Sequence, residues 1–186
     1  SGDWARPSWH WSRWRGGGVV PGREDFEEYV AARMPALLRT AYLLTGHPED
    51  AEDLVQTALV KAVPAWSRIA GEPDAYVRRI MVNENISRWR KRRGREVLVA
   101  DAPEGSSLDP DSADAVALEK ALATLAPKQR AVIVLRYFED LTERETAEIL
   151  GVAVGTVKSQ ARDALARLRL ALPGLDVEPL AEGAGR

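Results

Sequence analysis

The chain contains no cysteine and only two histidines, and these absences exclude several classes of protein. Without cysteine there are no disulfides, thiolate metal sites or thiol nucleophiles, and a reducing cytoplasmic setting is indicated. His10 and His47 stand apart, and the acids show neither metal-ligand nor nucleophile spacing, so we expect no enzyme, no cofactor and no metal. No apolar run approaches the roughly 20 residues of a membrane span, and we therefore expect no membrane insertion.

The net charge of -2 does not indicate a nucleic-acid-binding protein, but the distribution of charge along the chain does. Six Lys and Arg residues lie between Arg88 and Arg95 with no acid among them. Five acids follow in a stretch without a base, at Asp101, Glu104, Asp109, Asp111 and Asp114. Such segregation favours contact with DNA in one segment and exclusion of DNA from the other.

A chain of 186 residues can form one ordinary domain or two small ones, and its polar, Pro- and Gly-bearing middle favours two. Apolar residues at helical spacing on both sides predict an all-α fold of two small helical domains joined by a flexible acidic linker. The predicted divisions are a disordered Trp/Arg-rich arm at 1–22, a first domain at 23–93, the linker at 94–114, a second domain at 115–172 and a flexible tail at 173–186.

The first domain has three predicted helices. One runs from residue 23 to about residue 45, with Pro35 as a kink or short break and Gly46 as the stop. The next begins at Pro48, and a loop over 66–74 precedes the third, basic helix at 76–93. The second helix buries an apolar stripe made of Ala51, Leu54, Val55, Ala58, Leu59 and Ala62.

The outer face of this second helix is acidic and has two interpretations. Its members are Glu49, Asp50, Glu52, Asp53 and Gln56. Acids near a helix N-terminus are favoured by the helix dipole, so the face can simply be solvated. It can equally be a docking surface for a basic partner.

The residues from Leu141 onward have the pattern of a helix-turn-helix motif. Thr142 and Glu145 form a predicted capping box, and Gly151 supplies a left-handed turn. A second helix begins near Gly155 or Thr156, and its apolar positions face the domain. Its first turns therefore present polar side chains to the major groove, at Thr156, Lys158, Ser159 and Arg162.

The basic helix at 76–93 mixes arginines with amides, a hydroxyl and an indole, at Asn83, Asn85, Ser87 and Trp89. Binding of duplex phosphates needs only positive charge, whereas amides read base edges and an indole stacks on an unpaired base. The mixture therefore suits strand separation. The alternative is a surface helix with a solvated basic end and Trp89 packed in the core.

Taken together, these motifs resemble the extracytoplasmic-function (ECF) group of bacterial sigma factors, the two-domain promoter-specificity subunits of RNA polymerase. The resemblance covers about residues 24–172, and residues 42–46 further resemble an actinobacterial, SigE-like subgroup. Val154 departs from the family, which has a small polar residue before Gly155. The matching segments are Ala51-Glu52-Asp53-Leu54-Val55-Gln56, the helix at 76–93, Gly155-Thr156-Val157-Lys158-Ser159 and Ala164-Leu165-Ala166-Arg167-Leu168-Arg169.

The resemblance implies a role for each group of candidate residues. The minus-ten element would be melted and bound by Arg79, Asn83, Ser87, Arg88 and Arg90, with a loop at 67–73 forming much of a base pocket. The minus-35 element would be read by Thr156, Lys158, Ser159 and Arg162. The beta-prime coiled coil of core RNA polymerase would dock on Asp50, Glu52, Asp53 and Gln56.

The partners implied are core RNA polymerase, through its beta-prime coiled coil and beta flap, promoter DNA, and an anti-sigma protein. The acidic linker would thread the polymerase cleft toward the RNA exit path. An autonomous helix-turn-helix regulator that binds a palindrome as a dimer shares the C-terminal pattern and is the alternative. That alternative leaves the N-terminal half of the chain unexplained.

Overall fold

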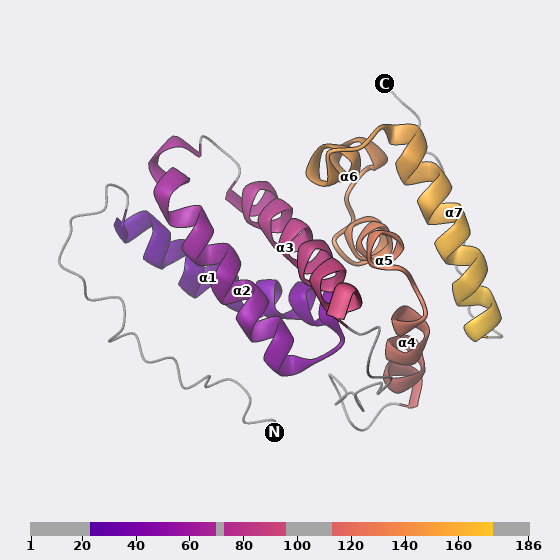
Figure 1. The fold of residues 1–186 in the computed structure, drawn as a ribbon. Coiled ribbons are helices and arrows are strands. Elements are labelled where there is room, and N and C mark those ends of the chain that lie inside the picture. The colour runs from indigo at the N-terminus through magenta and orange to yellow at the C-terminus, as the bar shows by residue number, and fades with distance from the viewer. Residues whose placement is uncertain (1–22, 70–72, 96–112, 173–186) are drawn as a thin grey trace.

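The computed structural model describes residues 23–69, 73–95 and 113–172, and every regular element in these ranges is helical (Figure 1). The predicted all-α fold is thus confirmed. The N-terminal bundle (23–95) comprises α1 (Arg23–Thr45), α2 (Pro48–Ala62), the 3-10 helix η2 (Val63–Arg68) and α3 (Pro73–Arg95). The C-terminal bundle (113–172) comprises α4 (Ala113–Ala123), α5 (Pro127–Ile133), the π-helix η4 (Val134–Phe138), α6 (Glu143–Leu150) and α7 (Val154–Ala171).

None of the helices described has the length and apolar character needed to cross a bilayer. The predicted arm at 1–22, the tail from residue 173 and residues 96–112 of the predicted linker lie outside the described residues.

The N-terminal bundle follows the predicted pattern at its two clearest points. Gly46 ends α1 with φ +83°, a left-handed conformation that costs glycine little. Pro48 then opens α2, where its missing N–H leaves no helical bond unmade. All six residues of the predicted apolar stripe of α2 are buried, and they pack between α1 and α3.

The structure corrects two predictions for this bundle. Of the kink or short break predicted at Pro35, the break does not occur, because α1 is helical from Arg23 to Thr45. Val30 and Leu37 on either side of Pro35 are buried in the same core, whereas Pro35 and Ala31 are exposed, so the unpaired carbonyl of Ala31 can bind water.

The predicted loop at 66–74 is also helical in part. It overlaps the 3-10 helix η2 at its start and α3 from Pro73 at its end. Trp66 is buried at the end of η2, and its ring meets the Phe26 ring edge-on at a centroid distance of 4.9 Å. This aromatic contact holds η2 against α1.

The C-terminal bundle contains the predicted helix-turn-helix. Thr142 accepts a hydrogen bond from the backbone N–H of Glu145, and the Glu145 carboxylate accepts one from the backbone N–H of Thr142, which confirms the capping box. Gly151 ends α6 with φ +64°. The predicted helix from Pro127 to Phe138 is present as α5 and η4, whose last turn widens so that the Glu139 N–H donates to Val134 O (3.0 Å).

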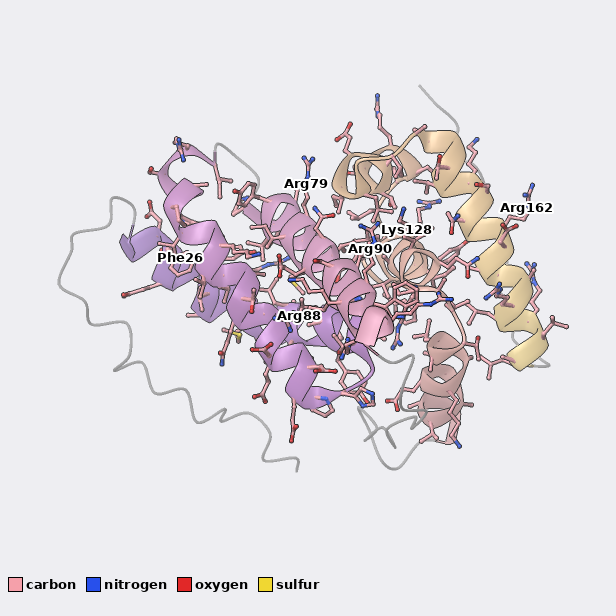
Figure 2. All side chains as sticks on the ribbon, in the orientation of Figure 1. Phe26, Arg79, Arg88, Arg90, Lys128 and Arg162 are labelled. Carbon is pink, nitrogen blue, oxygen red and sulfur yellow. The ribbon has the colours of Figure 1, made fainter. Side chains whose placement is uncertain are left out.

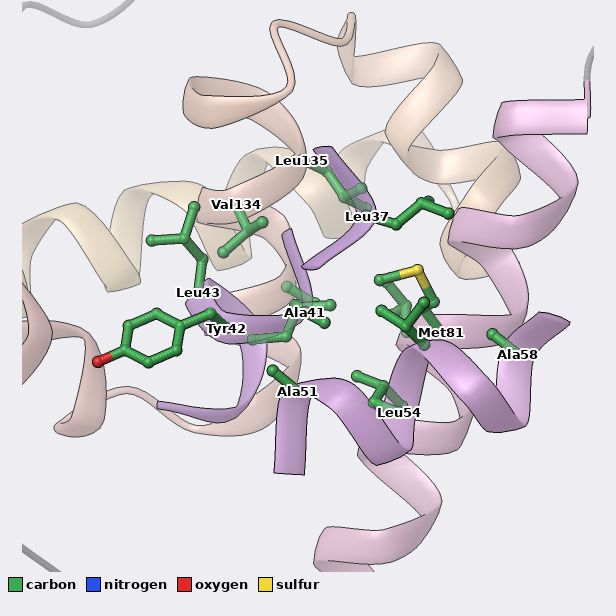
Figure 3. Close-up of a cluster of buried hydrophobic side chains, with 14 of the residues drawn as sticks. Leu37, Ala41, Tyr42, Leu43, Ala51, Leu54, Ala58, Met81, Val134 and Leu135 are labelled. Carbon is green, nitrogen blue, oxygen red and sulfur yellow. The ribbon is translucent and has the colours of Figure 1, made fainter. Parts of the chain in front are cut away.

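The two bundles share one hydrophobic core. Figure 3 shows Leu37, Tyr42 and Leu43 of α1 beside Val134 and Leu135 of η4. Of these five side chains, none is more than 6% exposed. The bundles are therefore packed against each other as they would be inside a single domain.

Polar contacts also join the bundles. The Tyr42 hydroxyl donates to Glu119 (3.0 Å), and the Arg130 Nε–H donates to the carbonyl of Leu43. Burial lowers the pKa of Arg130 to about 10, and its guanidinium lies at the C-terminal end of α1, where the helix dipole favours a cation. A Cβ at Gly46 would lie 3.3 Å from this guanidinium, a tight contact that adds to the preference for glycine set by its φ of +83°.

Candidate nucleic-acid and partner interfaces

The basic helix α3 carries part of the predicted minus-ten set on one exposed side. Arg79, Asn83 and Arg90 recur at intervals of four and seven residues, which places them on one stripe of a helix with 3.6 residues per turn. All three are exposed, and Ser87 lies half-buried at the edge of this stripe. The structure thus brings together Arg79, Asn83 and Arg90 of the predicted minus-ten set, with Ser87 beside them.

Arg88, the fifth member of that set, lies on the opposite side of α3 (Figure 2). Its Nη1 is 2.6 Å from the Asp53 carboxylate, and its Nη2 donates to Thr57 Oγ1 (2.8 Å). Arg88 therefore links α3 to α2 instead of joining the outward stripe.

The acidic face of α2 is next to this link. Glu52, Asp53 and Gln56 are exposed, and the Asp50 side chain is 38% exposed. Asp50 accepts from Arg92 at 3.2 Å, as Asp53 does from Arg88. The acidic residues predicted to bind polymerase do form one outer surface, and two of them are already paired with arginines of α3.

Asn85 and Trp89 face other parts of the fold. Asn85 is buried, and its Nδ2 donates to the carbonyl of Leu44 (3.3 Å), so it caps α1 instead of reading a base. Trp89 is half-buried, with the Arg93 guanidinium 5.1 Å from the centre of its ring. This cation–π contact joins two residues in the last turns of α3.

A cavity of about 800 Å³ lies between the start of α3 and helix α6. Arg68, Arg78 and Arg79 line it from the N-terminal bundle, and Glu145 and Glu148 line it from the C-terminal bundle. Its walls include parts of the segment predicted to form the base pocket, although residues 70–72 lie outside the described ranges and Asn83 is not part of the lining.

Sequence reasoning missed Arg78, which is on the side of α3 that meets the C-terminal bundle. Its Nη2 is 2.6 Å from Glu139 Oε2, and both side chains are less than a fifth exposed. The second carboxylate oxygen of Glu139 accepts from the Thr40 hydroxyl. The only signal in the sequence was the position of Arg78 beside Arg79, which does not reveal a partner 61 positions away.

The recognition helix α7 begins at Val154, slightly earlier than predicted, and its N-cap residue Ala153 makes no side-chain capping bond. Val157 is fully buried with Val132 and Ala147, and this small cluster fixes the crossing of α6 and α7. The polar residues of the first turns lie on the outside: Thr156, Lys158 and Arg162 are exposed and Ser159 is half-buried.

Lys158 and Arg162 of α7 each lie near an acid of their own bundle. Lys158 is 3.6 Å from Glu143, and Arg162 is 3.4 Å from Asp163 with its side chain 78% exposed. The Ser159 hydroxyl donates to the carbonyl of Thr156 (3.0 Å). The four residues predicted to read the minus-35 element therefore share the solvent side of the first turns of α7.

The fold and these surfaces define a DNA-binding protein in which a helix-turn-helix is joined to a helical bundle with a basic outer helix. The comparisons with known proteins agree. Residues 29–95 match the model of sigma-70 region 2, and residues 115–168 match that of sigma-70 region 4.

The chain is also similar to characterised sigma factors. It is 46% identical to an RNA polymerase sigma-E factor of Streptomyces avermitilis over 83% of this chain and 88% of the relative. It is 34% identical to the ECF sigma factor SigL of Mycobacterium tuberculosis over 83% and 90% of the two chains. The sigma factor RpoE of Bartonella quintana, solved in complex with the anti-sigma factor NepR, matches with a TM-score of 0.69 and 32% identity over 81% of this chain and 98% of that one.

The chain belongs to the sigma-70 family of RNA polymerase sigma factors, in its ECF group. This is a family of non-catalytic transcription initiation factors. The predicted resemblance is confirmed.

Proposed function

We propose that this sigma factor binds core RNA polymerase in the cytoplasm and directs it to promoters whose minus-35 element is read by α7 and whose minus-ten element is melted and held by α3. The observation that carries this proposal is the presence of two separate exposed polar stripes, one on each bundle. One lies on the first turns of a helix-turn-helix recognition helix, and the other joins arginines to an amide on a long basic helix.

At the minus-35 element, Lys158 and Arg162 are the donors suited to guanine edges or phosphates. Thr156 and Ser159 can bond to a base or to a phosphate from the same turns. The buried Val157 anchors these turns to the bundle through its contacts with Val132 and Ala147. Intact duplex is the form of DNA that such a helix reads.

At the minus-ten element, Arg79 and Arg90 supply charge at both ends of the exposed stripe, and Asn83 between them supplies an amide. Arginines hold the phosphates of a separated strand, and an amide can accept and donate hydrogen bonds at the edge of a flipped base. Ser87 adds a hydroxyl at the edge of the stripe. Arg88 holds α3 to α2, and we assign it to the support of this surface.

The acidic face of α2, with Asp50, Glu52, Asp53 and Gln56, is the surface we propose for the basic coiled coil of the beta-prime subunit. Opposite charges on the two surfaces would speed their encounter and orient the bundle. We expect the beta flap to bind the C-terminal bundle. An anti-sigma protein is a further expected partner, since a related chain is seen with one.

The test is run-off transcription with purified core polymerase on a library of promoter sequences. A sigma factor should give transcripts only as holoenzyme, with common minus-35 and minus-ten sequences among the selected templates. The alternative, an autonomous dimeric helix-turn-helix regulator, would instead protect a palindrome on duplex DNA in the absence of polymerase. That footprint, combined with no transcript from any template, would overturn the proposal.

A further inference from the structure

The packed arrangement of the two bundles does not fit the spacing of the two promoter elements. Elements at minus-35 and minus-ten are roughly 25 base steps apart, or about 85 Å of duplex at 3.4 Å per step. In this structure α5 and α6 lie between α3 and α7 (Figure 1), and two interhelical spacings amount to only about 20 Å. The bundles must therefore move apart before both elements can be read.

The contact that must break in this opening is centred on Glu139. This residue follows η4 in the C-terminal bundle, and its carboxylate uses one oxygen for Arg78 of α3 and the other for Thr40 of α1. A carboxylate that accepts from an arginine makes the same kind of charge-assisted hydrogen bonds as a phosphate oxygen. Glu139 thus places a carboxylate oxygen against Arg78 of α3, at a position where a phosphate oxygen could also bind.

The cavity beside this contact has the same complementarity of charge. Its N-terminal wall carries Arg68, Arg78 and Arg79, and its wall on α6 carries Glu145 and Glu148. Hydrogen bonds from Thr142 lower the pKa of Glu145, so this carboxylate keeps its charge. Acids of the C-terminal bundle therefore face Arg79, which belongs to the stripe assigned to the separated strand, and two arginines near it.

The geometry points to Arg78 as a further residue that binds the separated strand, with Glu139 holding the place of a strand phosphate while the bundles are packed together. This inference rests on the proposed function and deepens it. Arg78 and Arg79 line the same cavity, so a strand that contacts Arg79 passes within reach of Arg78. Opening of the bundles and binding of the strand are then linked, because each requires that Glu139 leave Arg78.

The experiment measures the affinity of the full chain, without polymerase, for a fluorescent 12-nucleotide single strand of mixed sequence. Phosphate contacts do not depend on sequence, so the unknown promoter is not needed. Glu139→Gln should tighten binding about fivefold, because it frees one arginine and removes one repelling charge. Its matched control is Glu28→Gln, which removes the same charge from an exposed residue of α1, a helix with no residue assigned to DNA, and should change the affinity less than about twofold.

A second variant tests whether Arg78 is the residue that gains the contact. Adding Arg78→Ala to Glu139→Gln should return the affinity to that of the wild type and should make the slope of log affinity against log salt about 0.7 shallower than in Glu139→Gln alone. The inference is overturned if Glu139→Gln binds no better than Glu28→Gln. It is also overturned if the double variant keeps the full gain.

Should Glu139→Gln fail to fold, as judged by circular dichroism, Arg78→Gln in the holoenzyme replaces it. The expected result is about a fivefold loss of affinity for the same single strand, and an unchanged affinity refutes the role of Arg78. Failure of the proposed function has a different signature, since the wild-type chain with core polymerase would then give no transcript whatever Arg78 does.

Discussion

The two helices that we assign to DNA differ in how their cations are held. On α3, Arg78 pairs with the other bundle, and Arg88 and Arg92 pair with the acidic face of α2. On α7, Lys158 lies near Glu143 and Arg162 lies near Asp163, both acids of the same bundle. Binding of DNA by Arg78 therefore competes with a contact between the bundles, whereas binding by Lys158 and Arg162 competes with these local pairs.

The difference matches the two tasks. Reading intact duplex needs a recognition helix that is ready before DNA arrives, and the first turns of α7 are exposed. Holding a separated strand is needed only when polymerase is in place and the strands are open. Because Arg78 is engaged with Glu139, α3 would bind stray single strands less tightly until the bundles open and release it.

The largest expected effect comes from breaking the core that both bundles share. Leu135 is fully buried in η4 against α1, so Leu135→Ala should lower the free energy of unfolding by about 2–5 kcal/mol. Because the core is common, both bundles should lose stability together in urea denaturation followed by circular dichroism. Leu170→Ala, at a side chain 84% exposed, is the control and should change it by less than about 0.5 kcal/mol. Two separated transitions, with the N-terminal one unchanged in Leu135→Ala, would contradict the shared core.

The comparison of the two helices is sharpened by one variant in each. Arg162→Ala should weaken the initial binding of holoenzyme to duplex promoter by about 1–3 kcal/mol, since it removes a donor at the major groove. Asn83→Ala should leave that step intact and reduce strand opening by a similar amount. Band shift at low temperature measures the first step, and permanganate reactivity of unpaired thymines measures the second. Equal defects of both variants in both assays would show that the helices do not divide the work.

The two sides of α3 are distinguished by the pair Arg90→Ala and Arg88→Ala. Arg90 is on the exposed stripe, so its loss should reduce the salt slope of single-strand binding by holoenzyme by about 0.7. Arg88 pairs with Asp53 and Thr57, so its loss should leave the slope unchanged and cost about 0.5 kcal/mol of stability. An altered slope in Arg88→Ala would return Arg88 to the strand-binding set.

Local sequence signals predicted the elements of this fold well, because their causes are local. The stop at Gly46, the start at Pro48 and the capping box of Thr142 and Glu145 each depend on residues within one turn. Pro35 misled because the cost of a proline depends on whether its side of the helix is exposed. The pattern of α1 alone does not reveal which of its sides the other helices cover.

The sequence predicted which residues make up the exposed stripe of α3, but not which residues pair with one another across the fold. The spacing of Arg79, Asn83 and Arg90 on one stripe follows from helical geometry. That Arg88 faces α2 and Arg78 meets Glu139 depends on how helices far apart in the chain pack together. The roles of Arg130 and Asn85 at the C-terminal end of α1 have the same origin, because both cap carbonyls that the sequence does not mark as open.

A smaller effect than that of Leu135→Ala is expected in α6, the helix whose acids face α3 across the cavity. Thr142→Ala removes the N-cap of α6 and should cost about 1 kcal/mol of stability at pH 7. Part of that stability comes from the capping-box hydrogen bonds between Thr142 and Glu145. Because Thr142 donates to the Glu145 carboxylate, the pKa of Glu145 in the folded chain is lower than its ordinary value of 4.5. A lowered pKa stabilises the folded state above pH 4.5, and this contribution is lost as the pH falls through the folded-state pKa.

The gap in unfolding free energy between wild type and Thr142→Ala should therefore be largest near neutral pH and narrow in acid, where Glu145 becomes protonated. Urea denaturation at pH 7 and at about pH 3 measures the two gaps. Glu148→Gln serves as the control, because it removes an exposed charge from the same helix outside the capping box. A gap that stays constant between the two pH values would mean that the Thr142 hydroxyl caps the backbone N–H of Glu145 without help from the carboxylate. In that case the charge of the Glu145 carboxylate, which faces the arginines of α3, would not depend on the capping box with Thr142.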